Sequence, residues 1–272
     1  MAIDNLVNER GPLAKTFAKL DPKTIQHSDE ITSQRRDNEE LRNQWFWTAD
    51  FAMYQMEGSD AVLYLARRPN NLIFQKIEEA TSQLIKTGNF IPSRDDAEKV
   101  AKAKSTLRLN LSGLGLERND SEYSFFAFNL ADPKLNKEQR KAVQRVYGRK
   151  DFKENMKMLA EAGVSTTRFY TLTPDYVKEH TKKGSALGRA CWLSSFDYDS
   201  NFDADGRDVS DPDYALRGVL KKVGEADVTK KFGIPDAYQL LLKDPAQAVK
   251  SMTPEHAEGM SKLVAAYLGK KH

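Results

Sequence analysis

Apolar positions recur at helical spacing over much of this chain. Between Asn38 and Met56 they follow steps of three and four residues, and Gly58 ends the pattern. The pattern predicts a helix that carries aromatic residues on more than one side, which is typical of a buried or interfacial helix. We therefore expect an interface made by the aromatic residues of this segment, which are Trp45, Trp47, Phe51 and Tyr54.

The same spacing recurs further along the chain. Further helices are predicted between Asn70 and Gly88, from Ser93 to about Lys104, and at about 136–147 and 151–162. Polar and apolar residues alternate with period two at 106–111 and 123–130, which predicts two strands of a long-looped antiparallel hairpin. β-Branched and aromatic residues favour further strands at 165–172 and 187–196. The expected fold class is therefore α+β, helix-dominated with a small antiparallel sheet.

The two ends of the chain differ from its middle. Residues 1–35 are polar and lack a sustained period, so they are expected to form a loosely ordered N-terminal arm. Residues 36–221 are assigned to an α+β core domain. Residues 222–272 are assigned to a C-terminal helical segment, in which Thr253-Pro254-Glu255 resembles a helix start because proline is tolerated at the first helical position.

Composition narrows the class of protein. The 272 residues include 40% hydrophobic and 30% charged residues, and this composition excludes a wholly disordered chain at a mean hydropathy of −0.64. The longest apolar clusters, at 61–66 and 125–128, are far shorter than the ~20 residues of a membrane-spanning helix, so we expect no membrane partner. The first ten residues contain two acids and no apolar stretch, so we expect a cytoplasmic or otherwise intracellular protein. Cys191 is the only cysteine, so an intramolecular disulfide is impossible.

The charge of the chain is unevenly distributed. The formal net charge is +3, but residues 197–213 contain seven aspartates and one arginine. This acidic segment therefore carries −6, and the rest of the chain carries +9. Opposite charges on two parts of one chain favour self-association through electrostatic complementarity.

Part of the acidic segment resembles a calcium loop. Asn201, Asp203, Asp205 and Gly206 match the first half of an EF-hand loop, in which oxygen ligands alternate before a glycine. The second half departs from that pattern, because Pro212 occupies the position of the bidentate carboxylate. The candidate ligands for Ca²⁺ are Asp199, Asn201, Asp203, Asp205, Asp208 and Asp211. A solvated acidic loop and a Mg²⁺-dependent hydrolase site are the alternatives.

Familiar catalytic motifs are missing from the sequence. The four histidines are isolated, and the chain has no Gly-x-Ser-x-Gly, Walker or Gly-x-Gly-x-x-Gly motif. Cys191 lies beside Trp192 in an apolar stretch, which is more typical of a small core residue than of a nucleophile. We therefore assign no catalytic residue.

Basic residues gather on the helices predicted at 136–147 and 151–162. They are Arg140, Lys141, Arg145, Arg149, Lys150 and Lys153. A second basic cluster lies at 178–183. Such clusters attract the phosphates of nucleic acids, although Glu138, Asp151 and Glu154 interrupt the first one. Nucleic-acid binding is therefore an alternative function, and a solvated helix face is the competing interpretation.

One stretch of about thirty residues resembles a known fold family. Arg189-Ala-Cys-Trp192, a stretch rich in Asp, Asn, Tyr and Ser, Arg207, and Leu216-Arg-Gly-Val219 are similar to the closing segment of C-type-lectin-like folds. That family includes the formylglycine-generating-enzyme branch and variable, retroelement-diversified proteins. The resemblance implies that residues 197–213 form a ligand-contact loop. The Gly- and Trp-rich upstream strands of the family are missing here.

Together these observations favour a non-catalytic binding or assembly protein. Its expected partner is itself or another protein, with a Ca²⁺ or ligand loop at 197–213. The alternatives are a nucleic-acid-binding protein that uses 140–153 and 178–183, a C-type-lectin-like ligand-binding protein, and a metal-dependent hydrolase.

Overall fold

The computed structural model describes residues 6–181, 185–206 and 209–220. The side chain of Asp205 is outside this description, as is the predicted C-terminal helical segment at 222–272. Within the described residues, no helix is long and apolar enough to cross a membrane.

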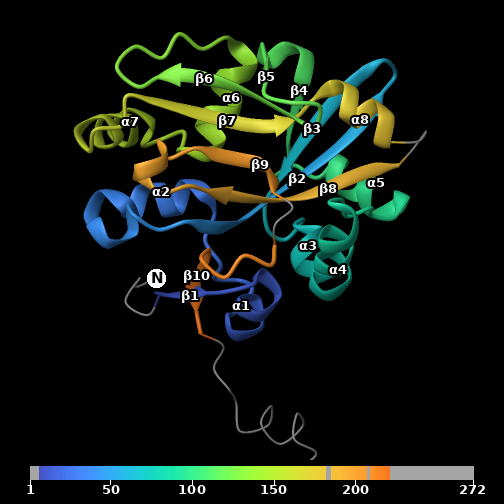
Figure 1. The fold of residues 1–272 in the computed structure, drawn as a ribbon, viewed down its shortest axis with the longest axis horizontal. Coiled ribbons are helices and arrows are strands. Elements are labelled where there is room, and N and C mark those ends of the chain that lie inside the picture. The colour runs from blue at the N-terminus through green and yellow to red at the C-terminus, as the bar shows by residue number, and fades with distance from the viewer. Residues whose placement is uncertain (1–5, 182–184, 207–208, 221–272) are drawn as a thin grey trace, which may run out of the picture. The chain divides into compact units, whose positions relative to one another are not determined.

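Ten strands form one mixed sheet in the described part of the chain. The strands are β1 (Leu6–Arg10), β2 (Phe46–Glu57), β3 (Asp60–Ala66), β4 (Leu107–Asn110), β5 (Glu117–Arg118), β6 (Tyr123–Asn129), β7 (Thr166–Leu172), β8 (Ala186–Leu193), β9 (Phe202–Gly206) and β10 (Ala215–Val219). Their order is β1-β10-β2-β8-β9-β7-β6-β5, and β3 pairs with both β2 and β4 (Figure 1). The β10–β2 and β7–β9 pairs are parallel, and the other pairs are antiparallel.

Helices cover parts of both faces of this sheet. They are α1 (Leu13–Lys19), α2 (Ser28–Asp37), α3 (Leu72–Gln75), α4 (Ile77–Thr87), α5 (Arg94–Lys102), α6 (Lys137–Val146), α7 (Phe152–Glu161) and α8 (Pro174–His180), with short 3-10 turns η1 (Glu39–Leu41), η2 (Leu111–Leu114) and η3 (Phe196–Tyr198). One core cluster packs α6 and α7 against the sheet, and a second packs α1, α3, α4 and α5 against the other face.

The prediction of a helix-dominated fold with a small sheet is wrong, because the longest strand of a ten-stranded sheet lies where the spacing predicts a helix. Residues 46–57 form the long strand β2, and residues 46–54 are buried along their whole length. Phe46 and Tyr54 face one core cluster, whereas Trp47, Phe51 and Met53 face the other. A strand buried on both faces is apolar at nearly every position, so helical and strand periods fit it equally well.

The strands expected at 106–111, 123–130, 165–172 and 187–196 are present as β4, β6, β7 and β8. The predicted hairpin is wrong, because β4 pairs with β3 whereas β6 pairs with β7 and β5. The sequence analysis predicts no strand at the position of β3. In the structure β3 pairs with β4, the strand that was expected to pair with β6. Pairing between distant segments is decided by the global arrangement of the sheet.

Residues 6–35, expected as a loosely ordered arm, are ordered elements of the fold. β1 pairs in register with β10 from Leu6 opposite Val219 to Arg10 opposite Ala215. Leu13, Leu20 and Ile25 are buried in the second core cluster. The segment lacks a sustained period because it consists of short elements, each of which contributes one or two apolar anchors.

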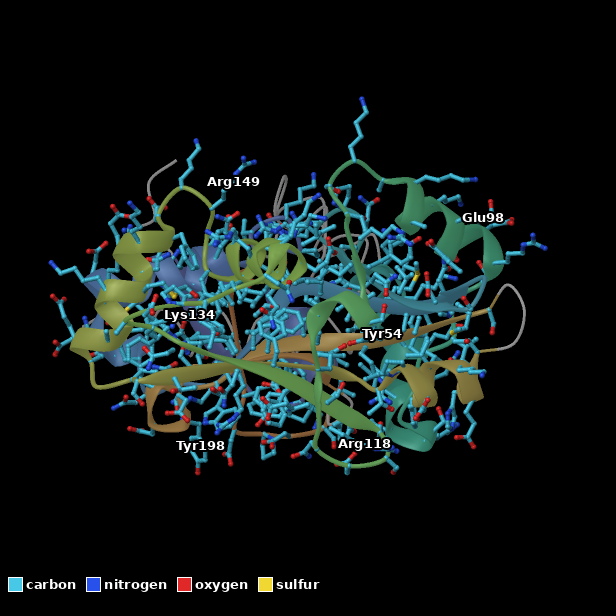
Figure 2. The ribbon with its side chains drawn as sticks, turned by 90° about the horizontal axis from the view of Figure 1, so that it is seen from above. Tyr54, Glu98, Arg118, Lys134, Arg149 and Tyr198 are labelled. Carbon is cyan, nitrogen blue, oxygen red and sulfur yellow. The ribbon has the colours of Figure 1, made fainter. Side chains whose placement is uncertain are left out.

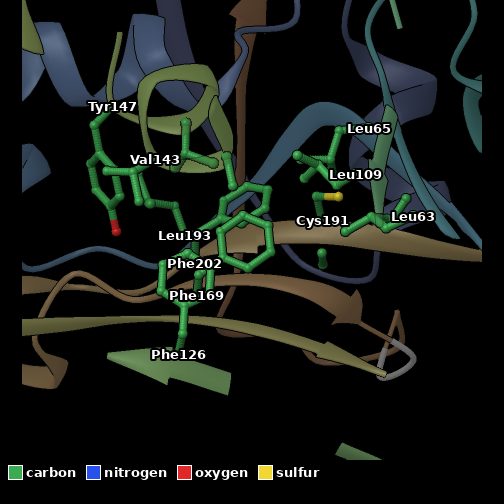
Figure 3. Close-up of a cluster of buried hydrophobic side chains, with 14 of the residues drawn as sticks. Leu63, Leu65, Leu109, Phe126, Val143, Tyr147, Phe169, Cys191, Leu193 and Phe202 are labelled. Atoms are coloured by element: carbon green, nitrogen blue, oxygen red, sulfur yellow. The ribbon is translucent and has the colours of Figure 1, made fainter. Parts of the chain in front are cut away.

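Two neighbouring rows of side chains run across the central strands of the sheet, one row on each face. Leu193, Phe202, Phe169 and Phe126 are register partners across β8, β9, β7 and β6, and all are buried in the first core cluster (Figure 3). Successive side chains of a strand point to opposite faces. The row one residue away, which is Trp192, Asp203, Tyr170 and Phe125, therefore lies on the opposite face of the same strands.

Candidate functional site

Four aromatic rings gather at one end of this second row. Trp45 lies just before β2, Trp192 in β8, Tyr198 in η3 and Tyr214 just before β10. The ring of Trp45 has its centroid 5.0 Å from Trp192, 4.8 Å from Tyr198 and 5.4 Å from Tyr214. Trp192 and Tyr214 stack at 5.3 Å. Aromatic rings at these separations attract one another, so the cluster is a preformed surface.

The cluster is accessible to solvent. Tyr198 is 59% exposed, and the other three rings are half-buried. Trp47 lies beneath them, 1% exposed, with its ring 4.8 Å from Tyr214 and perpendicular to it. The amide of Ala215 donates to the carbonyl of Trp45 at 2.8 Å, which joins the segments that carry Tyr214 and Trp45.

A second aromatic pair continues the row across the sheet. Phe125 and Tyr170 have ring centroids 5.4 Å apart, and both are half-buried and belong to neither core cluster. Asp203, which is 6% exposed, lies in register between Trp192 and Tyr170. The row therefore places a carboxylate between aromatic residues.

Further carboxylates adjoin the four-ring cluster. Asp197 and Asp199 flank Tyr198 in the chain, and Asp213 precedes Tyr214. Asp197 and Asp213 are exposed, and Asp199 lies 3.5 Å from the Arg168 guanidinium. We call the four rings, the row from Trp192 to Phe125 and these three aspartates the aromatic–acidic surface.

The fully buried cation Arg35 supports this surface from below. Its guanidinium donates to the carbonyls of Leu41, Gln44 and Ser194 at 2.8–3.0 Å and to the Ser200 hydroxyl at 3.1 Å. Gln44 precedes Trp45, whereas Ser194 and Ser200 bracket Tyr198, so one side chain fixes both segments. Burial lowers the pKa of Arg35 to about 9. No carboxylate pairs with it among the described residues, so backbone dipoles stabilise its charge.

The loop that carries Tyr198 has unusual backbone geometry. Asp199 and Ser200 have φ angles of 61° and 50°, in the left-handed region that non-glycine residues seldom adopt. The Ser194 hydroxyl donates to the Tyr198 carbonyl at 2.9 Å and accepts from the Asn201 amide at 2.7 Å. Such geometry persists only where surrounding contacts enforce it, and it clusters at functional sites.

Of the four residues predicted at an interface, only Trp45 reaches the surface. Trp47, Phe51 and Tyr54 are at most 1% exposed. The Tyr54 hydroxyl donates to the Ala204 carbonyl at 2.7 Å and lies 3.0 Å from the Thr171 hydroxyl, so it is satisfied within the core. The sequence analysis did not predict Trp192 and Tyr214 as surface residues of this cluster. They lie beside Trp45 only because β8 and β10 both pair with β2.

The predicted calcium ligands do not converge in the part of the chain that the structure describes. The Asn201 side-chain oxygen accepts from the Arg168 amide at 2.8 Å, and Asp199 lies near the Arg168 guanidinium. Asp203 is in strand β9, and Asp211 accepts from the Asp213 amide at 2.8 Å. No group of three His, Cys, Asp or Glu residues suited to a metal occurs among the described residues, which exclude Asp208 and the Asp205 side chain. Calcium binding stays a prediction.

Gly206 has a different role from the one expected in a calcium loop. It belongs to β9, and a Cβ atom there would lie 2.6 Å from the Ala190 carbonyl and 2.7 Å from the Trp192 ring. Glycine is therefore required for close approach between β9 and β8.

The predicted basic residues lie along α6, in the turn that follows it and at the start of α7. Arg140, Lys141, Arg149, Lys150 and Lys153 are exposed, and Arg145 is half-buried. The second basic cluster is not adjacent, because α8 and α7 lie at opposite ends of the sheet (Figure 1). Lys182 and Lys183 lie outside the described residues.

A partly buried ionic network lies beside these basic residues, and no pattern in the sequence indicates it. His27 Nδ1 lies 3.3 Å and Arg67 Nε 3.4 Å from the same oxygen of Asp50, and Arg67 Nη2 lies 2.7 Å from Asp29. Burial would raise the pKa of Asp50, but the hydrogen bond and charge of His27, with the charge of Arg67, hold it well below its usual range. A bulge in the β2–β8 pairing, between Trp47 and Phe51, places Asp50 there.

Comparison with known proteins adds one structural likeness. No family model and no curated protein matches the chain. A solved structure described as "Accommodation of massive sequence variation in Nanoarchaeota by the C-type lectin fold" superimposes with a TM-score of 0.48 at 9% identity. The match covers 79% of this chain and 96% of that one.

Proposed function

We propose that this chain is a non-catalytic binding protein that captures a protein partner through the aromatic–acidic surface. The observation that carries the proposal is the gathering of Trp45, Trp192, Tyr198 and Tyr214 at the surface, with carboxylates on the chain neighbours of the two tyrosines. The acidic segment 197–213 is thereby a ligand-contact segment, as the resemblance to C-type-lectin-like folds also implies.

The chemistry of the surface favours a partner with exposed lysine or arginine side chains. Aromatic faces attract cations, and nearby carboxylates add Coulombic attraction. Aromatic side chains are also enriched among residues that dominate binding energy at protein interfaces. The rings are held on strand ends and on a loop fixed by Arg35, so little ordering is needed when the partner binds.

A binding assay with single variants tests this proposal. The probe is a fluorescent peptide of alternating lysine and serine, with a glutamate–serine peptide as its charge-reversed counterpart. We expect saturable binding of the lysine peptide only, weakened about tenfold by Tyr198→Ala and by Trp45→Ala and retained by Tyr198→Phe. Ile91→Ala is the matched control, because Ile91 is 54% exposed and lies outside the surface.

The identity of the partner follows from a second measurement. If the partner is another copy of this chain, sedimentation velocity will show concentration-dependent association that weakens with salt and with Tyr198→Ala. If it is a different protein, the chain will stay monomeric while binding the lysine peptide. Equal binding of both peptides, or no effect of the ring variants, contradicts the proposal.

A further inference from the structure

Two cavities adjoin beside the start of α2 and the turn between α6 and α7. The smaller, of 430 Å³, is lined by the cations Arg67, Lys141, Arg145 and Arg149 and by the carboxylate Asp29. The larger, of 720 Å³, shares Asp29 and Arg149 with it. Neither belongs to the aromatic–acidic surface, and Figure 2 shows Arg149 and Tyr198 projecting on opposite sides of the molecule.

The charges in the smaller cavity are incompletely balanced. Lys141 pairs with Glu138 at 2.5 Å, and Arg67 lies between Asp29 and Asp50. Within the described part of the chain, no carboxylate pairs with Arg145 or Arg149. Two arginines therefore line this cavity without a partner of opposite charge.

Arg145 is held in place with donor capacity to spare. Its Nη2 donates to the carbonyls of Leu65, at 3.1 Å, and Ser105. Its Nε is buried and has no hydrogen-bond acceptor among the described residues. Burial, followed by the charge of Arg67, lowers the pKa of Arg145. An anion in the cavity would accept a hydrogen bond from this guanidinium. Its negative charge would offset the effects of burial and of the Arg67 charge on the pKa of Arg145.

The geometry points to a particular kind of anion. Guanidinium groups match the oxygens of phosphate, and two of them surrounding one cavity suit a phosphate group. The larger cavity has the size of a small-molecule site and is lined by polar side chains that include Thr24, Gln26, Ser33 and Gln34. These groups suit the hydroxyls of a sugar.

We propose that the two cavities form a binding site for a phosphorylated small molecule. The phosphate group occupies the smaller cavity beside Arg145 and Arg149, and the polar body of the ligand occupies the larger one. Among the described residues, no aromatic side chain lines either cavity, so this lining lacks the stacking surfaces with which proteins hold single-stranded nucleic acids. Four of the basic residues that suggested nucleic-acid binding line these cavities and are thereby assigned to a small ligand: Lys141, Arg145, Arg149 and Lys150.

Calorimetric titration of the full chain at constant ionic strength tests this site. The probes are ribose 5-phosphate, ribose, inorganic phosphate and a short oligothymidine. We expect saturable binding of ribose 5-phosphate, weaker binding of inorganic phosphate and none of ribose. The variant Arg149→Gln should weaken ribose 5-phosphate binding about tenfold, because it removes one charge-assisted hydrogen bond.

Arg140→Gln is the matched control, because Arg140 is an exposed arginine of α6 that lines neither cavity. It removes the same charge and should leave the affinity unchanged. Equal weakening by the two variants would reduce the site to general electrostatic attraction. The proposal is also overturned if ribose 5-phosphate gives no saturable binding, or if oligothymidine binds and ribose 5-phosphate does not displace it.

Discussion

The two candidate sites of this protein each depend on an arginine whose charge is stabilised in a different way, and Arg35 is fully buried whereas Arg67 is half-buried. Arg35, beneath the aromatic–acidic surface, is surrounded by three carbonyls and a hydroxyl. Arg67, beside the cationic cavities, lies between the carboxylates Asp29 and Asp50. The carbonyls bound to Arg35 belong to the backbone, so these hydrogen bonds hold the backbone segments in place. The carboxylates bound to Arg67 balance its positive charge. The contacts of Arg35 therefore position loops, whereas those of Arg67 determine the local electrostatic potential.

The contrast extends to what each region leaves exposed. Above Arg35 the loops present aromatic rings and carboxylates, whereas the cavities beside Arg67 present guanidinium groups. A substitution of Arg35 should therefore weaken binding at the aromatic–acidic surface and leave binding in the cavities unchanged. A substitution in the ionic network of Arg67 should have the opposite effect.

The largest effect is expected for Trp47, which separates the aromatic surface from the core. Trp47→Ala should lower the free energy of unfolding by about 3–5 kcal/mol, because it leaves a large buried cavity. Trp45→Ala should lower it by about 1 kcal/mol, since that ring is only half-buried. Urea unfolding monitored by far-UV circular dichroism measures both. Equal losses for the two variants would contradict the division between core and surface.

A loss of about 3 kcal/mol is expected for Arg35→Met, which leaves several buried acceptors without a donor. Affinity for the lysine peptide should fall because the Tyr198 loop loses its anchor, whereas ribose 5-phosphate binding should be unchanged. Arg36→Met on the same helix is the control and should change stability by less than about 1 kcal/mol. A loss of ribose 5-phosphate binding in Arg35→Met would show that the two regions are coupled.

The reciprocal variant is Asp50→Asn, expected to destabilise the protein by about 2 kcal/mol at neutral pH. The pKa of Asp50 is lowered in the folded state, so its contribution is complete above the unfolded pKa of about 3.9 and is lost as the pH falls below it. The stability of the wild-type protein should therefore decline more steeply below about pH 4 than that of the variant. Unfolding midpoints measured from pH 7 to pH 2 test this, and parallel profiles would exclude Asp50 as the source.

Local pattern was sufficient for the elements that have one buried face. α6 buries Ala142, Val143 and Val146 at helical spacing, and β6 alternates buried and more exposed residues. The sequence of such an element shows its period, because polar residues occupy the face that is exposed to solvent and apolar residues occupy the buried face. β2 is buried on both faces, so its period was lost and the fold class was misjudged.

The candidate sites were less accessible to prediction than the fold. Trp45 and the basic residues near Arg149 were singled out by residue type alone. Their partners Trp192, Tyr214 and Arg67 come from other strands and loops, so no spacing in the chain indicates them. Arg35 resembles any polar helical residue until the carbonyls that it binds are seen.

The sequence by itself determined the local elements that have one buried face, the absence of an intramolecular disulfide and the uneven distribution of charge, because these depend on residue type and short-range spacing. Only the tertiary structure decided which strands pair, which aromatic rings reach the surface and which cations line a cavity. Those outcomes depend on contacts between residues far apart in the chain, whose free energies appear only when the sheet is assembled.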